Sequence, residues 1–128
     1  MNIEMVKSLR ELQEEIYQGN VKAGWWTNLI TTEMKPKNDI TEILAKMMLM
    51  VSEIAEACEG ARKNLMDDKL PHRKMIEVEF ADAIIRILDT CGHEGLDVAG
   101  AIQEKLEYNA TRLDHTLEHR LADGGKKA

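Results

Sequence analysis

The chain has 128 residues, of which 44% are hydrophobic, 31% charged and only 4% aromatic, and its formal net charge is −6. The acidic balance argues against a partner that is a nucleic acid polymer, because such a surface needs clustered Lys and Arg. No apolar run approaches the roughly 20 residues that span a membrane, so we expect no membrane partner.

Composition favours an all-α protein, because prolines are rare and β-branched runs are nearly absent. We expect one all-α domain over residues 1–122, followed by a flexible tail over residues 123–128. Residues 1–4 lack the basic and apolar segments of a secretory signal. Cys58 and Cys91 stand alone in helical patterns, which predicts buried free thiols in a cytoplasmic protein.

Two helices are expected in the first half of the chain. Apolar residues at helical spacing predict the first over residues 2–18, and Gly19 is a suitable stop. The second begins near Asp39, which together with Glu42 three residues later is similar to a capping box. It continues to Gly60 or slightly beyond.

Two further helices are expected in the second half. A polar connection over residues 63–70 precedes the third, in which Pro71 suits the first turn and Gly92 marks the end. Asp97 is a plausible N-cap for a fourth helix, which lasts to about Leu121. The pattern therefore predicts four helices.

The second and third helices are apolar over most of their circumference. Between Ile43 and Val51 only Lys46 is polar, and the stretch from Met75 to Leu88 is similar. A helix of this kind is buried on more than one side, and a four-helix chain of this size hardly encloses two of them. We therefore expect a homodimer or homotetramer with these helices at its centre.

Two acidic pairs interrupt these apolar helices. Glu53 and Glu56 are three residues apart, as are Glu79 and Asp82, so each pair presents two carboxylates on one helical face. Four carboxylates converging from two packed helices repel one another and are costly to desolvate. A hard divalent cation removes both problems, which predicts a metal site that binds Mg²⁺, with Mn²⁺ as a substitute.

The fourth helix carries a complementary set of polar residues. Lys105, Asn109 and Arg112 recur at i, i+4 and i+7 and therefore share one stripe. Two cations and an amide on one face suit phosphate oxygens, and the alternative is a solvated face paired with Glu104 and Glu107. Beside a carboxylate cluster, the stripe predicts the second half of a site for a metal-bound polyphosphate.

In three segments the chain resembles the MazG-like all-α nucleoside triphosphate pyrophosphohydrolases, whose pattern is ExxE, a spacer, ExxD and a Lys/Asn/Arg helix. The resemblance covers roughly residues 40–115. Ser52 stands where the first motif of that family often has another Glu. The matching segments are Glu53-Ile54-Ala55-Glu56, Glu79-Phe80-Ala81-Asp82 and the helix with Lys105, Asn109 and Arg112.

The resemblance implies a four-helix, bundle-type fold and hydrolysis of a (deoxy)nucleoside triphosphate to a monophosphate and pyrophosphate, which cleans the nucleotide pool. Glu53, Glu56, Glu79 and Asp82 would bind Mg²⁺, and Lys105 with Asn109 and Arg112 would bind the phosphates. Glu53 or Glu56 would serve as the catalytic general base.

The adjacent Trp25 and Trp26 lie in a loop preceded by Gly24. Because two indoles are costly to expose, they either close a hydrophobic core or stack on a nucleobase. Asn28 is a candidate for contacting a base edge. Two alternatives remain for the whole chain: a phosphoribosyl-ATP type of pyrophosphohydrolase, or a non-catalytic helical interaction module whose acidic pairs form salt bridges.

Overall fold

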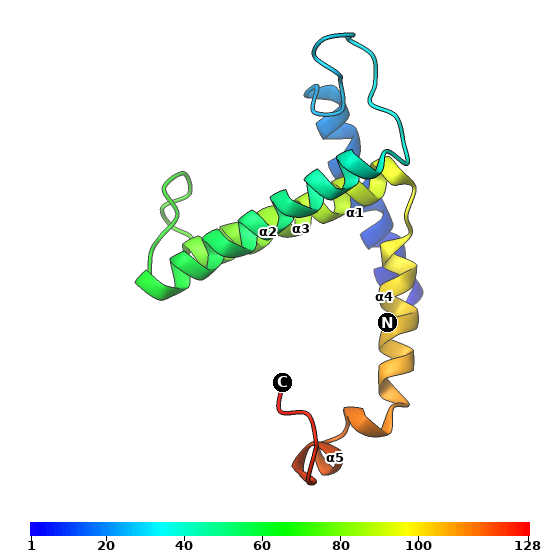
Figure 1. Cartoon of the computed structure of the whole chain (residues 1–128), viewed down its shortest axis with the longest axis vertical. Coiled ribbons are helices and arrows are strands. Elements are labelled where there is room, and N and C mark those ends of the chain that lie inside the picture. The colour runs from blue at the N-terminus through cyan, green and yellow to red at the C-terminus, as the bar shows by residue number, and fades with distance from the viewer. The chain divides into compact units, whose positions relative to one another are not determined.

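The computed structural model describes all 128 residues and consists of helices joined by loops and turns (Figure 1). It has no β-strand beyond two isolated bridges, so the expectation of an all-α protein is confirmed. In chain order the elements are α1 (Ile3–Lys22), α2 (Ile40–Lys63), α3 (Met75–Glu94), α4 (Val98–Ala110), the 3-10 turn η1 (Leu113–His115) and α5 (Leu117–Leu121).

The chain divides into two compact units. The first, here called the hairpin unit, is Glu11–Leu96 and holds the second part of α1 together with α2 and α3. The other, here called the terminal unit, is Met1–Arg10 with Asp97–Ala128 and holds α4, η1 and α5. None of the helices combines the length and apolar character needed to cross a lipid bilayer.

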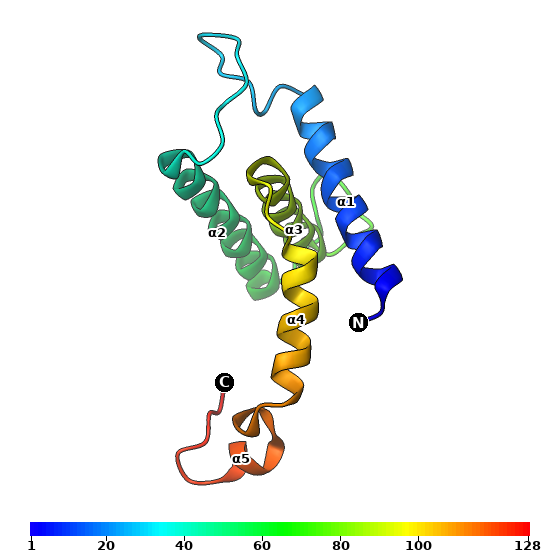
Figure 2. The same cartoon turned by 90° about the vertical axis from the view of Figure 1, so that its right-hand side faces the viewer.

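Helices α2 and α3 form an antiparallel hairpin, and they lie side by side in both views (Figures 1 and 2). The start of α2 is as predicted, because the Asp39 side chain accepts hydrogen bonds from the backbone N–H groups of Thr41 and Glu42. Its end at Lys63 also agrees with the prediction. Asn64, with a left-handed φ of 50°, closes the helix.

The residues between α2 and α3 form a hydrogen-bonded turn and do not begin a helix. The buried Asp67 carboxylate accepts hydrogen bonds from the N–H groups of Lys69 and Leu70, and its own N–H donates to the Arg73 carbonyl. Pro71 lies inside this turn, and α3 begins only at Met75. The prediction that Pro71 opens the third helix is therefore wrong, because the Asp67 turn fixes the backbone around it.

Gly92 is a packing position and not the end of α3, contrary to the prediction. A Cβ at this residue would lie 2.5 Å from the Tyr17 Cβ, so the absence of a side chain lets α1 approach α3. Nearby, the Gln13 side chain donates a hydrogen bond to the Leu96 carbonyl. The helix ends at Glu94 and is capped by Gly95, where φ is +68°.

The first helix also continues past the predicted stop at Gly19. The backbone N–H of Gly24 donates to the Val21 carbonyl and that of Trp25 donates to the Asn20 carbonyl. These two bonds, with φ of +88° at Gly24, form a Schellman motif that ends α1. Gly19 and Gly24 could each have ended the helix, and Gly24 is the residue that closes it.

Trp26 is the largest side chain in the core of the hairpin unit, with 1% of its surface exposed. Its Nε1 donates to Asp89 Oδ1 at 2.9 Å, and its ring stacks on His93 at a centroid distance of 3.8 Å. His93 is fully buried; Nε2 lies 3.2 Å from the Pro36 carbonyl and Nδ1 lies 3.0 Å from the Tyr17 hydroxyl. Because a carbonyl only accepts, Nε2 is the donor in the contact with Pro36, and Nδ1 shares the second hydrogen bond with the Tyr17 hydroxyl.

In the terminal unit, Asp97 caps α4 as predicted by accepting a hydrogen bond from the Gly100 N–H. Arg10 binds the same carboxylate with two hydrogen bonds of 3.0 and 2.7 Å. This guanidinium lowers the pKa of Asp97 to about 2. The ion pair joins the start of α1 to the start of α4.

The predicted fourth helix is broken. It ends at Ala110 instead of running to Leu121, and Arg112 adopts an extended conformation with ψ of 129°. The guanidinium of Arg112 turns to Asp114, with two hydrogen bonds of 2.9 and 2.7 Å. A separate cap at Thr116, which accepts from the His119 N–H, then starts α5.

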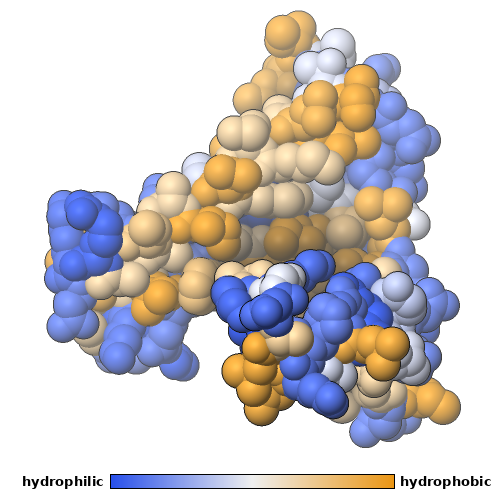
Figure 3. Space-filling view, turned by 60° about the horizontal axis from the view of Figure 1, so that its bottom comes forward, coloured by the Kyte–Doolittle hydropathy of each residue, from blue (hydrophilic) through white to orange (hydrophobic).

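Apolar side chains remain exposed along the hairpin. Figure 3 shows them in orange and tan over the arm that α2 and α3 form. Cys58 on α2 is also exposed, contrary to the prediction, because no neighbouring element covers it, whereas Cys91 is buried. Two stripes at i, i+4 and i+7 spacing stand out on this surface: Leu44, Met48 and Val51 on α2, and Phe80, Ile84 and Ile87 on α3.

The two helical glycines Gly92 and Gly19 provide a matched test of the packing. We expect Gly92→Ala to destabilise the protein by about 1–3 kcal/mol, because its methyl group overlaps Tyr17. Gly19→Ala meets nothing within 4 Å and should stabilise α1 by up to about 1 kcal/mol. Urea denaturation measures both, and equal effects of the two substitutions would contradict the close approach of α1 and α3.

Candidate metal centre between α2 and α3

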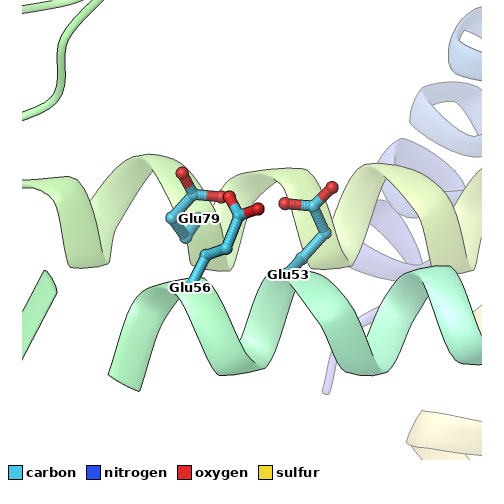
Figure 4. Close-up of side chains that lie close together, drawn as sticks. All are labelled: Glu53, Glu56 and Glu79. Atoms are coloured by element: carbon cyan, nitrogen blue, oxygen red, sulfur yellow. The ribbon is translucent and has the colours of Figure 1, made fainter. Parts of the chain in front are cut away.

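The antiparallel packing of α2 and α3 brings three of the predicted carboxylates together. Glu53 and Glu56 extend from successive turns of α2, and Glu79 reaches toward them from α3 (Figure 4). Each contributes one oxygen atom, and these atoms all lie within 4.8 Å of one another. The i, i+3 spacing places the first two side chains on the face of α2 that meets α3.

Of the three carboxylates, Glu79 is the one whose burial is least offset by other interactions. Only 8% of its surface is exposed, and its Oε2 is buried with no hydrogen-bond partner. Burial and the adjacent Glu53 and Glu56 carboxylates together raise the pKa of Glu79 to about 8. An unpartnered buried oxygen is costly unless another group satisfies it.

The donor set fits a hard divalent cation. The three groups offer oxygen atoms alone, which Mg²⁺ and Mn²⁺ prefer, and no nitrogen or sulfur ligand lies among them. A cation at this position would satisfy the buried Oε2 of Glu79 and offset the mutual repulsion of the carboxylates. Only Glu53 has a positively charged partner, Arg86, whose Nε donates to Oε1 at 2.8 Å.

Asp82 does not belong to the group of three. It lies one turn beyond Glu79 on α3 and is half-buried. Its pKa is raised, first by burial and then by the charge of Glu53. The structure thus brings three of the four predicted ligands together and leaves Asp82 beside them, on the wall of a cavity.

This cavity, of about 310 Å³, opens next to the carboxylates within the hairpin unit. A hollow of about 790 Å³, which shares Trp25, Lys46 and Arg86 with it, continues along the loop after α1. Acidic, basic and aromatic groups therefore line two neighbouring hollows. The side chains around the smaller cavity include Glu53, Asp82, Asp89, Lys46, Arg86 and Trp25.

The structure separates the roles of the adjacent tryptophans. Trp26 closes the core, the first of the two alternatives considered for the pair, and is inaccessible to a base. Trp25 is 66% exposed and lines both hollows. Asn28 lines the larger hollow, but its Oδ1 accepts hydrogen bonds from the N–H groups of Ile30 and Thr31 and so supports the loop.

The predicted phosphate-binding residues lie in the terminal unit. Lys105 and Asn109 are on α4, whereas Arg112 lies beyond its end, so the three do not form one helical stripe as predicted. The break arises from the Arg112–Asp114 ion pair. The two cations still gather around one ring, because Lys105 Nζ and Arg112 Cζ lie 4.8 and 5.8 Å from the centroid of Tyr108.

Two basic residues that line the cavity were not identified as functional from the sequence. Lys46 is the one polar residue between Ile43 and Val51, and Arg86 follows Asp82 by four residues. The sequence nevertheless distinguishes both positions. Lys46 is a charge inside an apolar run, and Arg86 is a cation one helical turn from an acidic residue. Neither signal specifies which side of the helix faces a cavity.

The raised pKa of Glu79 has a measurable consequence for the metal-free protein. Its folded-state pKa of about 8 exceeds the ordinary value of 4.5, so the folded state binds the proton more tightly than the unfolded chain does. The contribution of Glu79 to the free energy of unfolding therefore falls as pH rises from 4.5 to about 8. Relative to wild type, Glu79→Gln should gain stability over this window, by at most about 1.4 kcal/mol per pH unit.

Urea unfolding in EDTA at several pH values across the window measures this difference. Glu77→Gln is the matched control, because Glu77 is exposed on the same helix and pairs with Arg73, and its profile should parallel that of wild type. Parallel profiles for Glu79→Gln and wild type would show that Glu79 is not held in its protonated form.

No family model matches the chain, and no curated protein or solved structure matches it significantly. The evidence for function therefore comes from the side chains of the chain itself.

Proposed function

We propose that this protein is a Mg²⁺-dependent nucleoside triphosphate pyrophosphohydrolase of the MazG-like type. It converts a (deoxy)nucleoside triphosphate to the monophosphate and pyrophosphate and thereby removes unwanted nucleotides. The observation that carries the proposal is the group Glu53, Glu56 and Glu79, with its buried, unpartnered oxygen, beside a cavity whose lining includes two cations. The order ExxE, ExxD in the sequence supports it independently.

The side chains divide the chemistry among them. Glu53, Glu56 and Glu79 would hold Mg²⁺, which when bound activates water and neutralises phosphate charge. Glu56 is exposed and pairs with no cation, so it is the better placed general base, whereas Glu53 is held by Arg86. Water attacks the α phosphorus and gives up a proton to Glu56, the bond between the α phosphorus and the bridging oxygen breaks, and pyrophosphate leaves with that oxygen.

Trp25 provides the surface for the base in this proposal. Its indole is exposed where the two hollows meet, and every nucleobase presents a π face to an aromatic ring. Asn28 lines the larger hollow and would contact a base edge through its Nδ2, because its Oδ1 is held by the loop. The phosphoribosyl-ATP type of substrate uses the same acidic centre and differs in what occupies this hollow.

The exposed apolar stripes of α2 and α3 favour self-association as part of the proposal. Leu44, Met48 and Val51 form one stripe, and Phe80, Ile84 and Ile87 the other. Two hairpins packed through these stripes complete a four-helix bundle and remove the apolar surface from water. The same stripes are what a helical interaction module would offer, so the acidic centre must decide between the two functions.

Pyrophosphate release tests the enzyme directly. A screen of the common NTPs and dNTPs with Mg²⁺ should yield pyrophosphate and no orthophosphate. Glu53→Gln and Glu79→Gln should each lower kcat by more than about a hundredfold, because each removes a ligand of the metal. Glu77→Gln on the same helix should retain activity.

Thermal unfolding separates the enzyme from the interaction module. Mg²⁺ together with a nucleotide should raise the Tm of an enzyme, because both ligands bind the native state. An unchanged Tm together with no pyrophosphate from any nucleotide would leave the interaction module as the better account.

The assembly has its own test by light scattering. We expect a mass of two or four times the 14.5 kDa of the chain at micromolar concentration. Ile84→Glu places a charge in the apolar stripe and should shift the mass toward the monomer. Ile30→Glu, a matched change at an exposed loop residue, should leave the mass unaltered, and a monomeric wild type would disprove self-association.

A further inference from the structure

In the hairpin unit, Lys46 is largely buried and lies close to no carboxylate that it does not share. Lys46 projects from the apolar run of α2, and only 16% of its side chain is exposed. Its Nζ lies 4.5 Å from the centroid of the buried Trp26 ring and 3.7 Å from Glu42 Oε1. Burying an ammonium group is costly unless a partner compensates its charge.

Glu42 is a shared and distant partner for Lys46. The same Oε1 accepts a hydrogen bond from Lys35 at 2.9 Å, so one carboxylate serves two ammonium groups. Lys46 is the more distant of the two and lines both hollows. Lys46 therefore has no close ion pair of its own along the wall of the two hollows.

Arg86 brings a second cation to the same cavity. Its Nε donates to Glu53 Oε1 at 2.8 Å, while its two Nη groups make no hydrogen bond within the chain. An arginine held through Nε keeps the outer edge of its guanidinium for another acceptor, and phosphate oxygens match that geometry. Arg86 thus pairs with one carboxylate of the metal site and also lines the cavity that Lys46 lines.

We propose that Lys46 and Arg86 bind the phosphate chain of the nucleotide, inside the hairpin unit. This inference rests on the proposed function and moves the phosphate site from Lys105, Asn109 and Arg112 to the cavity that adjoins the carboxylates. Arg112 is already committed to Asp114 by two hydrogen bonds. Lys46 and Arg86 line the same cavity as Glu53, so one unit provides both the metal ligands and the phosphate contacts.

The charges of the cavity make phosphate binding depend on the metal. Glu53, Asp82 and Asp89 face the two cations across about 310 Å³, so the wall is net negative without a divalent ion. A polyphosphate alone is repelled there, whereas a metal ion at the carboxylates reverses the balance. Nucleotide affinity should therefore be lost in EDTA.

The test uses Lys46→Met, which keeps the alkyl stem over Trp26 and removes the charge. Calorimetry with an α,β-methylene triphosphate analogue and Mg²⁺ should show a Kd raised by at least about tenfold, as expected for the loss of a charge-assisted contact. Lys46→Arg should restore most of the affinity, and Lys69→Met, at an exposed lysine of the same unit, should bind as wild type. Kinetics should show the loss chiefly in KM.

Arg86→Gln provides a second test in case Lys46→Met does not fold. Arg86 is partly exposed on α3, so its substitution should disturb the core less. It should also weaken analogue binding by at least about tenfold. Wild-type affinity in Lys46→Met and Arg86→Gln, with a large loss in Lys105→Gln, would overturn the inference and leave the proposed function standing. A wild-type protein that binds no analogue with Mg²⁺ and releases no pyrophosphate would overturn both.

Discussion

Repulsion among like charges is the constraint around which the hairpin unit is built. One carboxylate oxygen each of Glu53, Glu56 and Glu79 lies within 4.8 Å of the other two because α2 and α3 pack side by side. The chain offsets only part of this electrostatic repulsion. Arg86 pairs with Glu53, and the pKa of Glu79 is raised to about 8, so that Glu79 keeps its proton at neutral pH. Such an arrangement of carboxylates suits the proposed metal centre, where a divalent cation would offset the remaining repulsion.

The core beside the centre explains how the cavity keeps its form. Asp89 accepts a hydrogen bond from Trp26 and also lines the cavity, and Lys46 lies over the same Trp26 ring. His93 joins this ring to the Tyr17 hydroxyl and the Pro36 carbonyl. The loop after α1 is therefore fixed at two points, and Trp25 owes its place at the cavity to its buried neighbour.

Local chemistry made some features predictable from the sequence. Asp39 and Asp97 act as N-caps as expected, because a short carboxylate before an apolar run satisfies free N–H groups whatever the tertiary structure. The convergence of Glu53, Glu56 and Glu79 followed from helical periodicity and one short connection.

Other features depend on contacts that the sequence does not display. Gly19 and Gly92 resemble helix stops, yet one is simply exposed in α1 and the other makes room for Tyr17. Pro71 is governed by the Asp67 turn, and the end of α4 depends on the ion pair that Arg112 forms with Asp114. The same reasoning applies to Lys46, whose cavity is formed by a loop remote in sequence.

The adjacent indoles differ in what their substitution would change. Trp26 is held by a stacked ring, a buried hydrogen bond and a cation, so substitution there disturbs the whole core. Trp25 contributes little to that core and faces the hollow. A substitution at position 25 would therefore alter the lining of the hollow and leave the packing of the core in place, whereas one at position 26 would disrupt that packing.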